Sequence, residues 1–184
     1  MGIYLGLGSN VGDRESQLRF AVSALQGKDV VLWKSASLYW TQPRELEDQP
    51  WFLNTVVEVR TLLEPERLIQ ECLEVERMAG RLRDVPKGPR SLDIDILIYK
   101  DRILDLPGLT IPHPRYRERR FVLVPLVELA PDLADAIDQS HETVARNGAL
   151  SVEVPTPALG QGERDDAGDE ESHEAGEPGT DQPA

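Results

Sequence analysis

Two aspartates separated by a single residue are the feature of this sequence most suggestive of chemistry. Asp93 and Asp95 lie in residues 88–98, GPRSLDIDILI, whose apolar, β-branched second half is typical of a strand. Residues two apart on a strand point to the same face, so the two carboxylates are expected side by side, with Ile94 and Ile96 facing a core. Adjacent carboxylates repel each other unless a cation separates them. Because Mg²⁺ binds one or two carboxylates together with substrate phosphates, the spacing fits a metal site.

Basic residues on both sides of this pair favour a site for phosphate groups. Arginines and one histidine precede and follow the strand: Arg81, Arg83, Arg90, His113, Arg115, Arg117, Arg119 and Arg120. Cations that converge on a carboxylate pair are typical of sites that position a polyphosphate and stabilise its charge. The alternative is a pair of solvent-exposed acids on a charged face, since an isolated Asp-X-Asp is common. The residue pattern alone leaves both interpretations open.

A second candidate site combines an aromatic ring with a carboxamide. Phe52 and Asn54 share one face of a predicted strand, by the same alternation. A ring beside an amide can stack on a flat heterocycle and hydrogen-bond to its edge. Phe121 is a candidate for a second stacking ring. In the alternative interpretation both phenylalanines belong to the core and Asn54 to a turn.

The glycine-rich segment of residues 6–10, GLGSN, is a weaker candidate for a phosphate loop. It lacks the lysine and the spacing of a Walker loop, and it does not fit a dinucleotide-binding fingerprint. It is more typical of a tight turn from a strand into a helix. The turn predicts an unusual backbone conformation at Gly8 or Asn10. Ser9 or Asp13 is expected near the start of the helix.

Hydrophobic periodicity predicts an α+β domain that would hold these residues. Helices are expected at 18–25, after Pro65 until near Gly80, and at 122–129, and strands at 3–7, 30–39, 52–62, 92–99 and 102–106. The order is βαββαβ, followed by additional C-terminal strand and helix elements. It predicts a ferredoxin-like sandwich, in which two helices lie on one face of a mainly antiparallel sheet.

The net charge of −13 comes mostly from the C-terminal end of the chain. Residues 155–184 contain nine acidic residues, a single Arg164 and no aromatic residue. Such a segment buries too little apolar surface to offset the entropy of ordering it, so we expect a disordered acidic tail there. The predicted folded domain therefore spans residues 1–154.

The remaining composition argues against several classes of protein. The single cysteine, Cys72, rules out an intrachain disulfide, and its helical pattern favours core packing over a nucleophilic role. No window reaches the roughly 18 apolar residues of a membrane span. The N-terminus lacks the basic region of a signal peptide. We therefore expect a cytoplasmic protein.

Five segments, in order along the chain, are similar to one family of enzymes. They are LGLGSNVGDR (residues 5–14), DQPWFLNTVV (48–57), GRLR (80–83), GPRSLDIDILIY (88–99) and TIPHPRYRERRFVLVPLVELAP (110–131). Through them the chain resembles the 6-hydroxymethyl-7,8-dihydropterin pyrophosphokinases of folate biosynthesis. The resemblance implies that the hydroxyl of the pterin alcohol attacks the β-phosphorus of ATP, giving AMP and the pterin pyrophosphate.

The resemblance also implies roles for individual residues. Asp93 and Asp95 would bind two Mg²⁺ ions and, with Arg81 and Arg90, form the catalytic set. The expected ATP-binding residues are Glu76, Arg81, Arg83, Arg90, Ile96, Thr110, His113 and Arg119. The expected pterin-binding residues are Thr41, Gln42, Pro43, Arg44, Phe52, Asn54, Asp93 and Phe121. The two phenylalanines would enclose the pterin ring between them.

Two departures from the family pattern concern the loop before the aspartates and one stacking ring. Many members have a tryptophan before Gly-Pro-Arg, where this chain has Lys87, and the loop of residues 81–90 is slightly shorter. The departure affects how this loop closes over a ligand. Phe52 stands where a tyrosine also occurs, so the ring face is kept and a hydroxyl is lost.

Two other functions fit parts of the pattern. A ferredoxin-like domain can bind RNA or a small molecule without chemistry, although aspartates on the sheet disfavour RNA. A different two-metal phosphotransferase or hydrolase would share the acids, but the aromatic and amide pair favours a flat heterocycle. We expect no nucleic-acid partner, no membrane association and no obligate protein partner.

Overall fold

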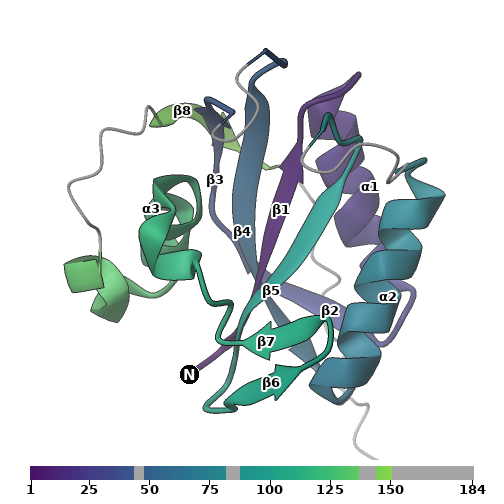
Figure 1. Cartoon of the computed structure of the whole chain (residues 1–184), viewed down its shortest axis with the longest axis vertical. Coiled ribbons are helices and arrows are strands. Elements are labelled where there is room, and N and C mark those ends of the chain that lie inside the picture. The colour runs from purple at the N-terminus through teal and green to yellow at the C-terminus, as the bar shows by residue number, and fades with distance from the viewer. Residues whose placement is uncertain (44–47, 82–87, 137–143, 151–184) are drawn as a thin grey trace, which may run out of the picture. The chain divides into compact units, whose positions relative to one another are not determined.

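The computed structural model describes residues 1–43, 48–81, 88–136 and 144–150. An antiparallel sheet lies at its centre (Figure 1). The strands are β1 (Ile3–Ser9), β2 (Val30–Ser35), β3 (Ser37–Thr41), β4 (Phe52–Thr61), β5 (Asp93–Tyr99), β6 (Leu104–Leu106), β7 (Leu109–Ile111) and β8 (Val144–Ala149). The helices are α1 (Arg14–Gln26), α2 (Pro65–Met78) and α3 (Arg120–Leu129), with short 3-10 helices η1 (Tyr116–Glu118) and η2 (Pro131–Ala136).

Strand pairing confirms the predicted α+β class. The strand order in the main sheet is β5-β1-β4-β3-β8, and β2 also pairs with β4. All of these pairs are antiparallel. β6 and β7 form a separate hairpin. The central position of β1, between β4 and β5, matters most for the site described below.

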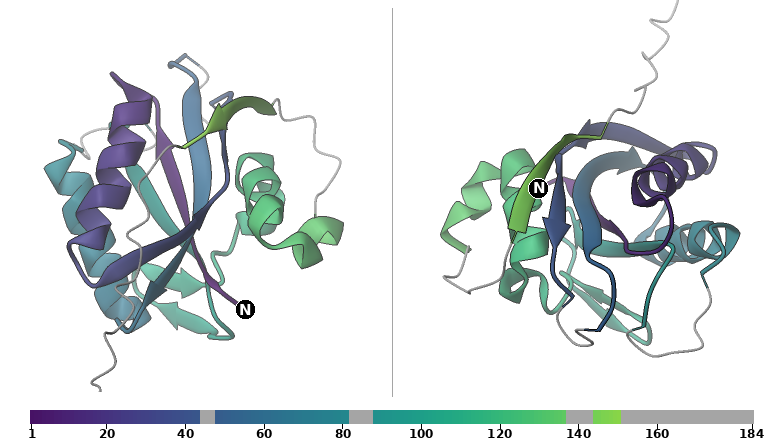
Figure 2. Two further views of the ribbon diagram at one scale, coloured as in Figure 1. Left: turned by 180° about the vertical axis from the view of Figure 1, so that it is seen from behind. Right: turned by 90° about the horizontal axis from the view of Figure 1, so that it is seen from above.

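Helices cover both faces of the main sheet (Figure 2). α1 and α2 lie side by side on one face, where they form a first core with Leu5 and Leu7 of β1. Cys72 of α2 is fully buried in this core, which confirms its predicted place. α3 lies on the opposite face and packs in a second core against Tyr4 and Leu97. The two predicted helices on one face are therefore confirmed.

Local sequence signals set the ends of α1 and α2. α1 begins after Asp13, whose carboxylate accepts a hydrogen bond from Ser16 N at 3.2 Å, and it ends at Gly27. α2 begins with Pro65, which is favoured in the first helical turn. The chain leaves α2 through Gly80, whose φ of +74° suits glycine. The cap at Asp13 and the bounds of α2 agree with the prediction, whereas α1 is longer than the predicted 18–25.

The strand predicted over residues 30–39 is in fact two strands, β2 and β3. The break falls at Ala36, whose N–H donates to Val56 O at 2.9 Å. Both strands still pair with β4, so the connection order is unchanged. A break of this kind leaves the β-branched and aromatic composition intact, and the composition therefore gave no sign of it.

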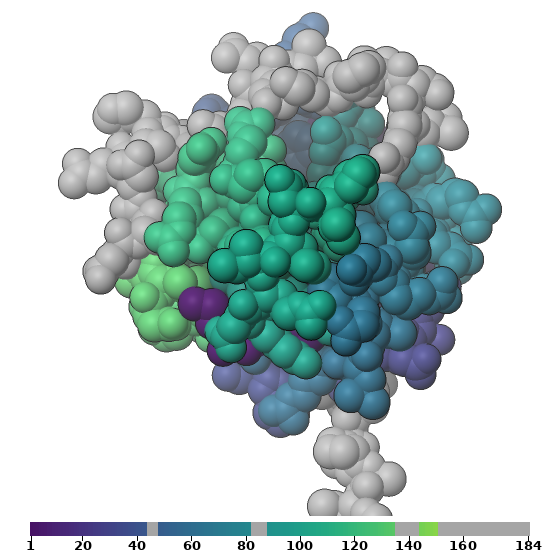
Figure 3. Space-filling view, turned by 60° about the horizontal axis from the view of Figure 1, so that its bottom comes forward, coloured from purple at the N-terminus to yellow at the C-terminus, as the bar shows by residue number. Residues whose placement is uncertain are grey.

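The β6–β7 hairpin lies beside the main sheet. In the space-filling view its residues, in teal, lie between α2 in blue and the α3 region in green (Figure 3). After β7, His113 N donates to Leu97 O at 2.8 Å and so attaches the chain to β5. Within the described ranges, no helix combines the length and the apolar character that a membrane span requires.

A carboxylate of α3 ties this helix to β3. Glu128 accepts hydrogen bonds from Ser37 N at 2.8 Å and from the hydroxyl of Tyr39. Burial, together with the hydrogen bond to Glu128, raises the pKa of Tyr39 to about 12, so the phenol keeps the proton that it donates. Arg146 of β8 reaches the same corner and donates to Ser37 Oγ at 2.9 Å. The C-terminal elements α3 and β8 are thus linked through β3.

Replacing Glu128 by Gln should lower the free energy of unfolding by about 1–2 kcal/mol. Glutamine keeps the size of the side chain but offers one acceptor oxygen to two donors, both on buried residues. Urea denaturation followed by circular dichroism measures the difference. Glu118→Gln is the matched control, because that side chain is 65% exposed, and it should stay within about 0.5 kcal/mol of the parent. Equal stability of the two variants would contradict this role of Glu128.

Candidate active site

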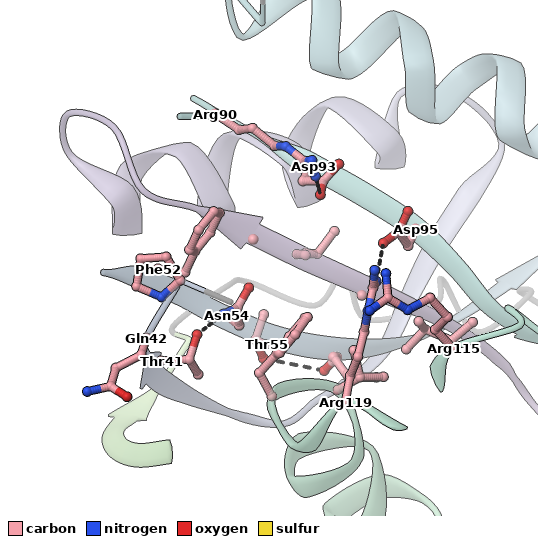
Figure 4. A pocket seen from close by; sticks show the side chains of 18 of the residues that line it. Thr41, Gln42, Phe52, Asn54, Thr55, Arg90, Asp93, Asp95, Arg115 and Arg119 are labelled. Atoms are coloured by element: carbon pink, nitrogen blue, oxygen red, sulfur yellow. Dashed lines mark hydrogen bonds and ion pairs between the residues drawn. The ribbon is translucent and has the colours of Figure 1, made fainter. Parts of the chain in front are cut away.

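A hollow on the α3 face of the sheet gathers most of the residues that were predicted to carry chemistry (Figure 4). It is lined by β1, β3, β4, β5 and the start of α3. The predicted residues in its lining are Thr41, Gln42, Pro43, Phe52, Asn54, Arg90, Asp93, Asp95, Arg119 and Phe121. The structure therefore brings the two candidate sites of the sequence together in a single site.

Glycines on the central strand make room for this hollow. Gly8 of β1 pairs with Asn54 on one side and with Asp93 on the other. In the next row Gly6 pairs with Asp95. Because neighbouring strands lie about 4.8 Å apart, Asn54 and Asp93 lie roughly 10 Å apart, with Gly8, which has no side chain, between them. A Cβ atom on Gly8 would lie only 2.4 Å from Asn54 Oδ1.

One wall of the hollow presents the predicted aromatic and amide pair. Phe52 and Asn54 line it together from β4. Asn54 Nδ2 donates to Thr41 Oγ1 at 2.6 Å, and this bond fixes the plane of a side chain that is 7% exposed. Gln42 and Pro43 continue the wall beyond β3. The wall combines a ring, an oriented amide and a polar rim.

On the opposite wall, Asp93 is held between two arginines. Arg81 Nη1 lies 2.6 Å from Asp93 Oδ1, and Arg90 Nη1 forms an ion pair with Asp93 Oδ2. Arg81 also pairs with Glu76, whose Oε1 accepts a hydrogen bond from Ile94 N at 2.8 Å. Glu76 is buried, so water competes little with this network. Charge-assisted bonds of this kind keep both guanidinium groups close to the aspartate.

Asp95 has a different environment from Asp93. Arg119 Nη1 is 3.9 Å from Asp95 Oδ2, at the limit of an ion pair. Desolvation, followed by repulsion from Asp93, raises the pKa of Asp95 to about 6, although Arg119 acts in the opposite direction. The side chain is 41% exposed, and this exposed surface borders the hollow. A cation between the two carboxylates would relieve this repulsion, so the pair fits a metal site.

The ligand set also limits what kind of metal site this is. In the part of the chain that the structure describes, no three Asp, Glu, His or Cys side chains gather in a metal-binding cluster. Two carboxylates leave most of the coordination sphere of Mg²⁺ to other oxygen atoms. The aspartate pair therefore fits an ion that arrives with an anionic substrate better than an ion held by protein alone.

The remaining predicted site residues do not line the hollow. Four of them lie elsewhere in the described structure: Glu76, Ile96, Thr110 and His113. The side chain of Ile96 is buried in the first core, as the alternation predicted. Arg81 touches Asp93 from outside the lining. The predicted Arg44 and Arg83, and the departure at Lys87, fall outside the described residues.

Asn10 joins three segments that frame the hollow. Its side-chain Nδ2 donates to Gln49 Oε1 at 3.0 Å and to Pro50 O at 3.1 Å, and its Oδ1 accepts a hydrogen bond from Arg90 N at 2.7 Å. The glycine-rich segment is not a phosphate loop, but the predicted turn starts later than expected, because residues 6–9 continue β1 and only Asn10 lies beyond the strand. The prediction of its unusual backbone position was wrong, because the positive φ of 64° belongs to Gly12.

A comparison with protein families decides between the functions that this geometry allows. The model of one family, 7,8-dihydro-6-hydroxymethylpterin-pyrophosphokinase, matches residues 4–131. The chain belongs to this pyrophosphokinase family. The match covers β1 to α3, and so every described residue of the hollow.

Individual relatives support this assignment. The chain is 46% identical to 2-amino-4-hydroxy-6-hydroxymethyldihydropteridine pyrophosphokinase of Bacillus subtilis over 127 residues, which are 68% of this chain and 76% of that protein. It is 43% identical to the enzyme of the same name from Methylorubrum extorquens over 153 residues, 82% of this chain and 96% of that protein. It also matches the folic acid synthesis protein fol1 of Pneumocystis carinii at 39% identity, over 73% of this chain but only 18% of that protein. The predicted family and enzyme class are confirmed.

Some lining residues of this pyrophosphokinase were not predicted from its sequence. They include Gly6, Gly8, Gln49 and Thr55. The two glycines acquire their role from the register between β1 and its neighbours, which a single sequence does not give. Arg115 stood within the predicted basic cluster, but the sequence alone did not distinguish it from the arginines that lie outside the hollow.

Replacing Gly8 by Ala should weaken pterin binding by roughly tenfold or more while nucleotide binding changes little. The new methyl group would displace the Asn54 amide, which reads the ligand edge in our interpretation. Calorimetric titration with the pterin and with an ATP analogue measures both affinities.

Two controls separate this effect from a general loss of structure. Gly27→Ala adds a methyl group at the end of α1, where its closest contact is 3.6 Å, and should bind both ligands normally. In an Asn54→Ala background, Gly8→Ala should cause little further loss, because both changes remove the same contact. Fully additive losses would show that Gly8 acts independently of Asn54.

Proposed function

We propose that the hollow is a bisubstrate site in which the chain transfers pyrophosphate from ATP to 6-hydroxymethyl-7,8-dihydropterin. The observation that carries this proposal is the register that sets Asn54 and Asp93 on either side of Gly8. One wall suits a flat heterocycle with hydrogen-bonding edges, and the other suits phosphates and a cation. The reacting hydroxyl group of the pterin would lie between the walls, over β1.

The pterin would bind at the aromatic and amide wall. Asn54, oriented by Thr41, presents both a donor and an acceptor to the edge of the heterocycle. Phe52 and Phe121 would stack on its two faces. Gln42, Pro43 and Arg44 would also bind the pterin, as the resemblance implies, and Asp93 would lie near its hydroxymethyl group.

The aspartate pair would hold two Mg²⁺ ions together with the phosphates of ATP. Asp93 and Asp95 supply hard carboxylate oxygens, which Mg²⁺ prefers. When bound, the metal neutralises phosphate charge and makes the attacking hydroxyl more acidic. Desolvation and, after it, repulsion from Asp93 raise the pKa of Asp95, and a cation between the two carboxylates would relieve that repulsion.

Arginines would bind and orient the phosphates. Arg81 and Arg90 are already positioned at Asp93, so an entering polyphosphate would meet cations that need little reorganisation. Arg119 would act beside Asp95. The other predicted ATP-binding residues would complete the nucleotide site: Arg83 and His113 at the phosphates, and Glu76, Ile96 and Thr110 near the nucleoside.

The reaction itself is an in-line displacement at phosphorus. The hydroxyl oxygen of the pterin forms a bond to the β-phosphorus and loses its proton. The bond from the β-phosphorus to the oxygen that bridges it to the α-phosphorus breaks, and AMP leaves with that oxygen. The residues of the hollow contribute mainly positioning and charge stabilisation, as is usual for transfer of phosphoryl groups.

We also assign the core of the domain to the ferredoxin-like arrangement. The helices α1 and α2 connect strands of one antiparallel sheet in the order βαββαβ, with β2 and β3 counted together. Both helices pack on the same face. These features support the assignment, and α3 and β8 are additions to it.

The chain should release AMP, and not ADP, when it is supplied with ATP, Mg²⁺ and hydroxymethyl-dihydropterin. Asp95→Asn should lower this rate by about 100-fold or more, because the substitution removes a proposed metal ligand. Chromatography of the nucleotides measures both outcomes. Asp101→Asn is the control, since that side chain is 87% exposed in a turn and should leave the rate unchanged. ADP as the product, or an Asp95→Asn rate within about tenfold of the parent, would exclude the proposal.

The metal-free protein should titrate near pH 6 at Asp95. The Asp93→Asn substitution should lower that midpoint, because it removes a neighbouring negative charge. Carboxyl ¹³C NMR follows the titration, and Asp105→Asn provides a control away from the pair. Because folding raises this pKa from 3.8, the contribution of the bound proton to stability is present at low pH and is lost as the pH rises through about 6. An unchanged midpoint in Asp93→Asn would contradict coupling within the pair.

A further inference from the structure

We propose that Arg115 is a further ATP-binding residue, which contacts the polyphosphate chain of the nucleotide. This inference rests on the proposed function, because it assigns one more contact in the same hollow. Arg115 is absent from the residues that the family resemblance assigned to ATP binding. The basic cluster in the sequence included Arg115 without a specific role, and the structure places it in the lining together with Asp95 and Arg119.

Backbone hydrogen bonds hold Arg115 next to β5, the strand that carries Asp93 and Asp95. His113 N donates to Leu97 O on β5 at 2.8 Å, and Tyr116 N donates to His113 O at 3.1 Å. Arg115 N itself donates to His113 Nδ1 at 3.2 Å. Tyr116 is buried in the second core against α3. The base of the Arg115 side chain is therefore fixed relative to β5, which carries both aspartates.

The side chain of Arg115 extends from this base toward Arg119 and Asp95 (Figure 4). Two guanidinium groups thus converge at one end of the hollow, next to the carboxylate with the weaker ion pair. Two like charges at close range repel each other, and an anion bound between them would be attracted by both. A planar guanidinium can also bind two oxygens of a phosphate at once.

The electrostatics of the neighbouring histidine agree with this placement. Burial lowers the pKa of His113, and the charges of Arg119 and Arg115 lower it further. Glu118 Oε2 lies 3.5 Å from Arg115 Nε, but that carboxylate is 65% exposed. An exposed ion pair of this kind contributes little, so a phosphate in the hollow can compete with it.

Arg117, two residues further along, provides a matched comparison. Its Nε donates to Tyr116 Oη at 2.8 Å, and its guanidinium lies 5.3 Å from the centre of the same ring. Arg117 does not line the hollow. Both arginines lie in the same turn and carry the same charge, but only Arg115 of the two lines the hollow.

Calorimetric titration of the full chain with Mg²⁺ and α,β-methylene-ATP, and separately with AMP, tests the proposal. Arg115→Gln should weaken binding of the triphosphate analogue by roughly 10- to 100-fold, because a charge-assisted contact is lost. Its affinity for AMP should change less than about threefold, since most of the phosphate charge is missing there. Arg115→Lys should retain part of the triphosphate affinity, and Arg117→Gln should retain all of it.

The outcomes separate the proposed contact from a structural role. Equal weakening for the triphosphate and for AMP, or equal effects of Arg115→Gln and Arg117→Gln, would overturn the proposal. Thermal unfolding of each variant shows whether the fold is intact, and Arg115→Lys gives the comparison if Arg115→Gln is unstable. Failure of the parent chain to release AMP would refute the proposed reaction, whereas the nucleotide titrations would still decide the role of Arg115.

Discussion

At Gly6 and Gly8 the central strand presents only hydrogen atoms to one face of the sheet, and the site depends on this. Glycine within a strand is costly, by about 0.5–1 kcal/mol per residue. β1 tolerates it because the strand is paired along its length with both β4 and β5, and because Leu5 and Leu7 anchor its other face in the first core. A strand that is paired on both sides thus carries the residues that contribute least to packing. That combination leaves a hollow with a rigid floor.

Charge then gives the two walls of the hollow different characters. The Asn54 wall is neutral and is ordered by a single amide-to-hydroxyl bond. The opposite wall holds Asp93 between Arg81 and Arg90, whereas the ion pair of Asp95 with Arg119 is long, at 3.9 Å. Desolvation, followed by repulsion from Asp93, raises the pKa of Asp95, and the distant Arg119 offsets this rise only in part. An incoming cation and its phosphates can satisfy both carboxylates and the arginines at once, and neither partner alone can do so.

Short-range patterns predicted those parts of the molecule that depend on alternation and on capping. The shared face of Asp93 and Asp95, the shared face of Phe52 and Asn54, and the cap at Asp13 follow from local geometry, and all three are present in the structure. Local geometry does not predict that the two walls lie on either side of β1. Their placement depends on the register of β1 against strands that lie about 50 and 90 residues away in the chain. The same non-local packing selects Arg115 from a run of similar arginines. Family resemblance supplied the reaction, which spacing alone left undetermined.

Two contacts suggest that the halves of the site respond to each other. Arg119 lies 3.9 Å from Asp95 and also 5.5 Å from the centre of the Phe121 ring, so one guanidinium lies near both the aspartate wall and a proposed pterin-stacking ring. Asn10 binds the segments that carry Gln49 and Arg90, one on each side of the hollow. A phosphate that draws Arg119 away from Phe121 would expose that face of the ring. A shift of Arg90 would displace Gln49, because the buried Asn10 side chain hydrogen-bonds to both segments. In the proposed site, occupation of the nucleotide half would therefore change the surface offered to the heterocycle, through the contacts of Arg119 and Asn10.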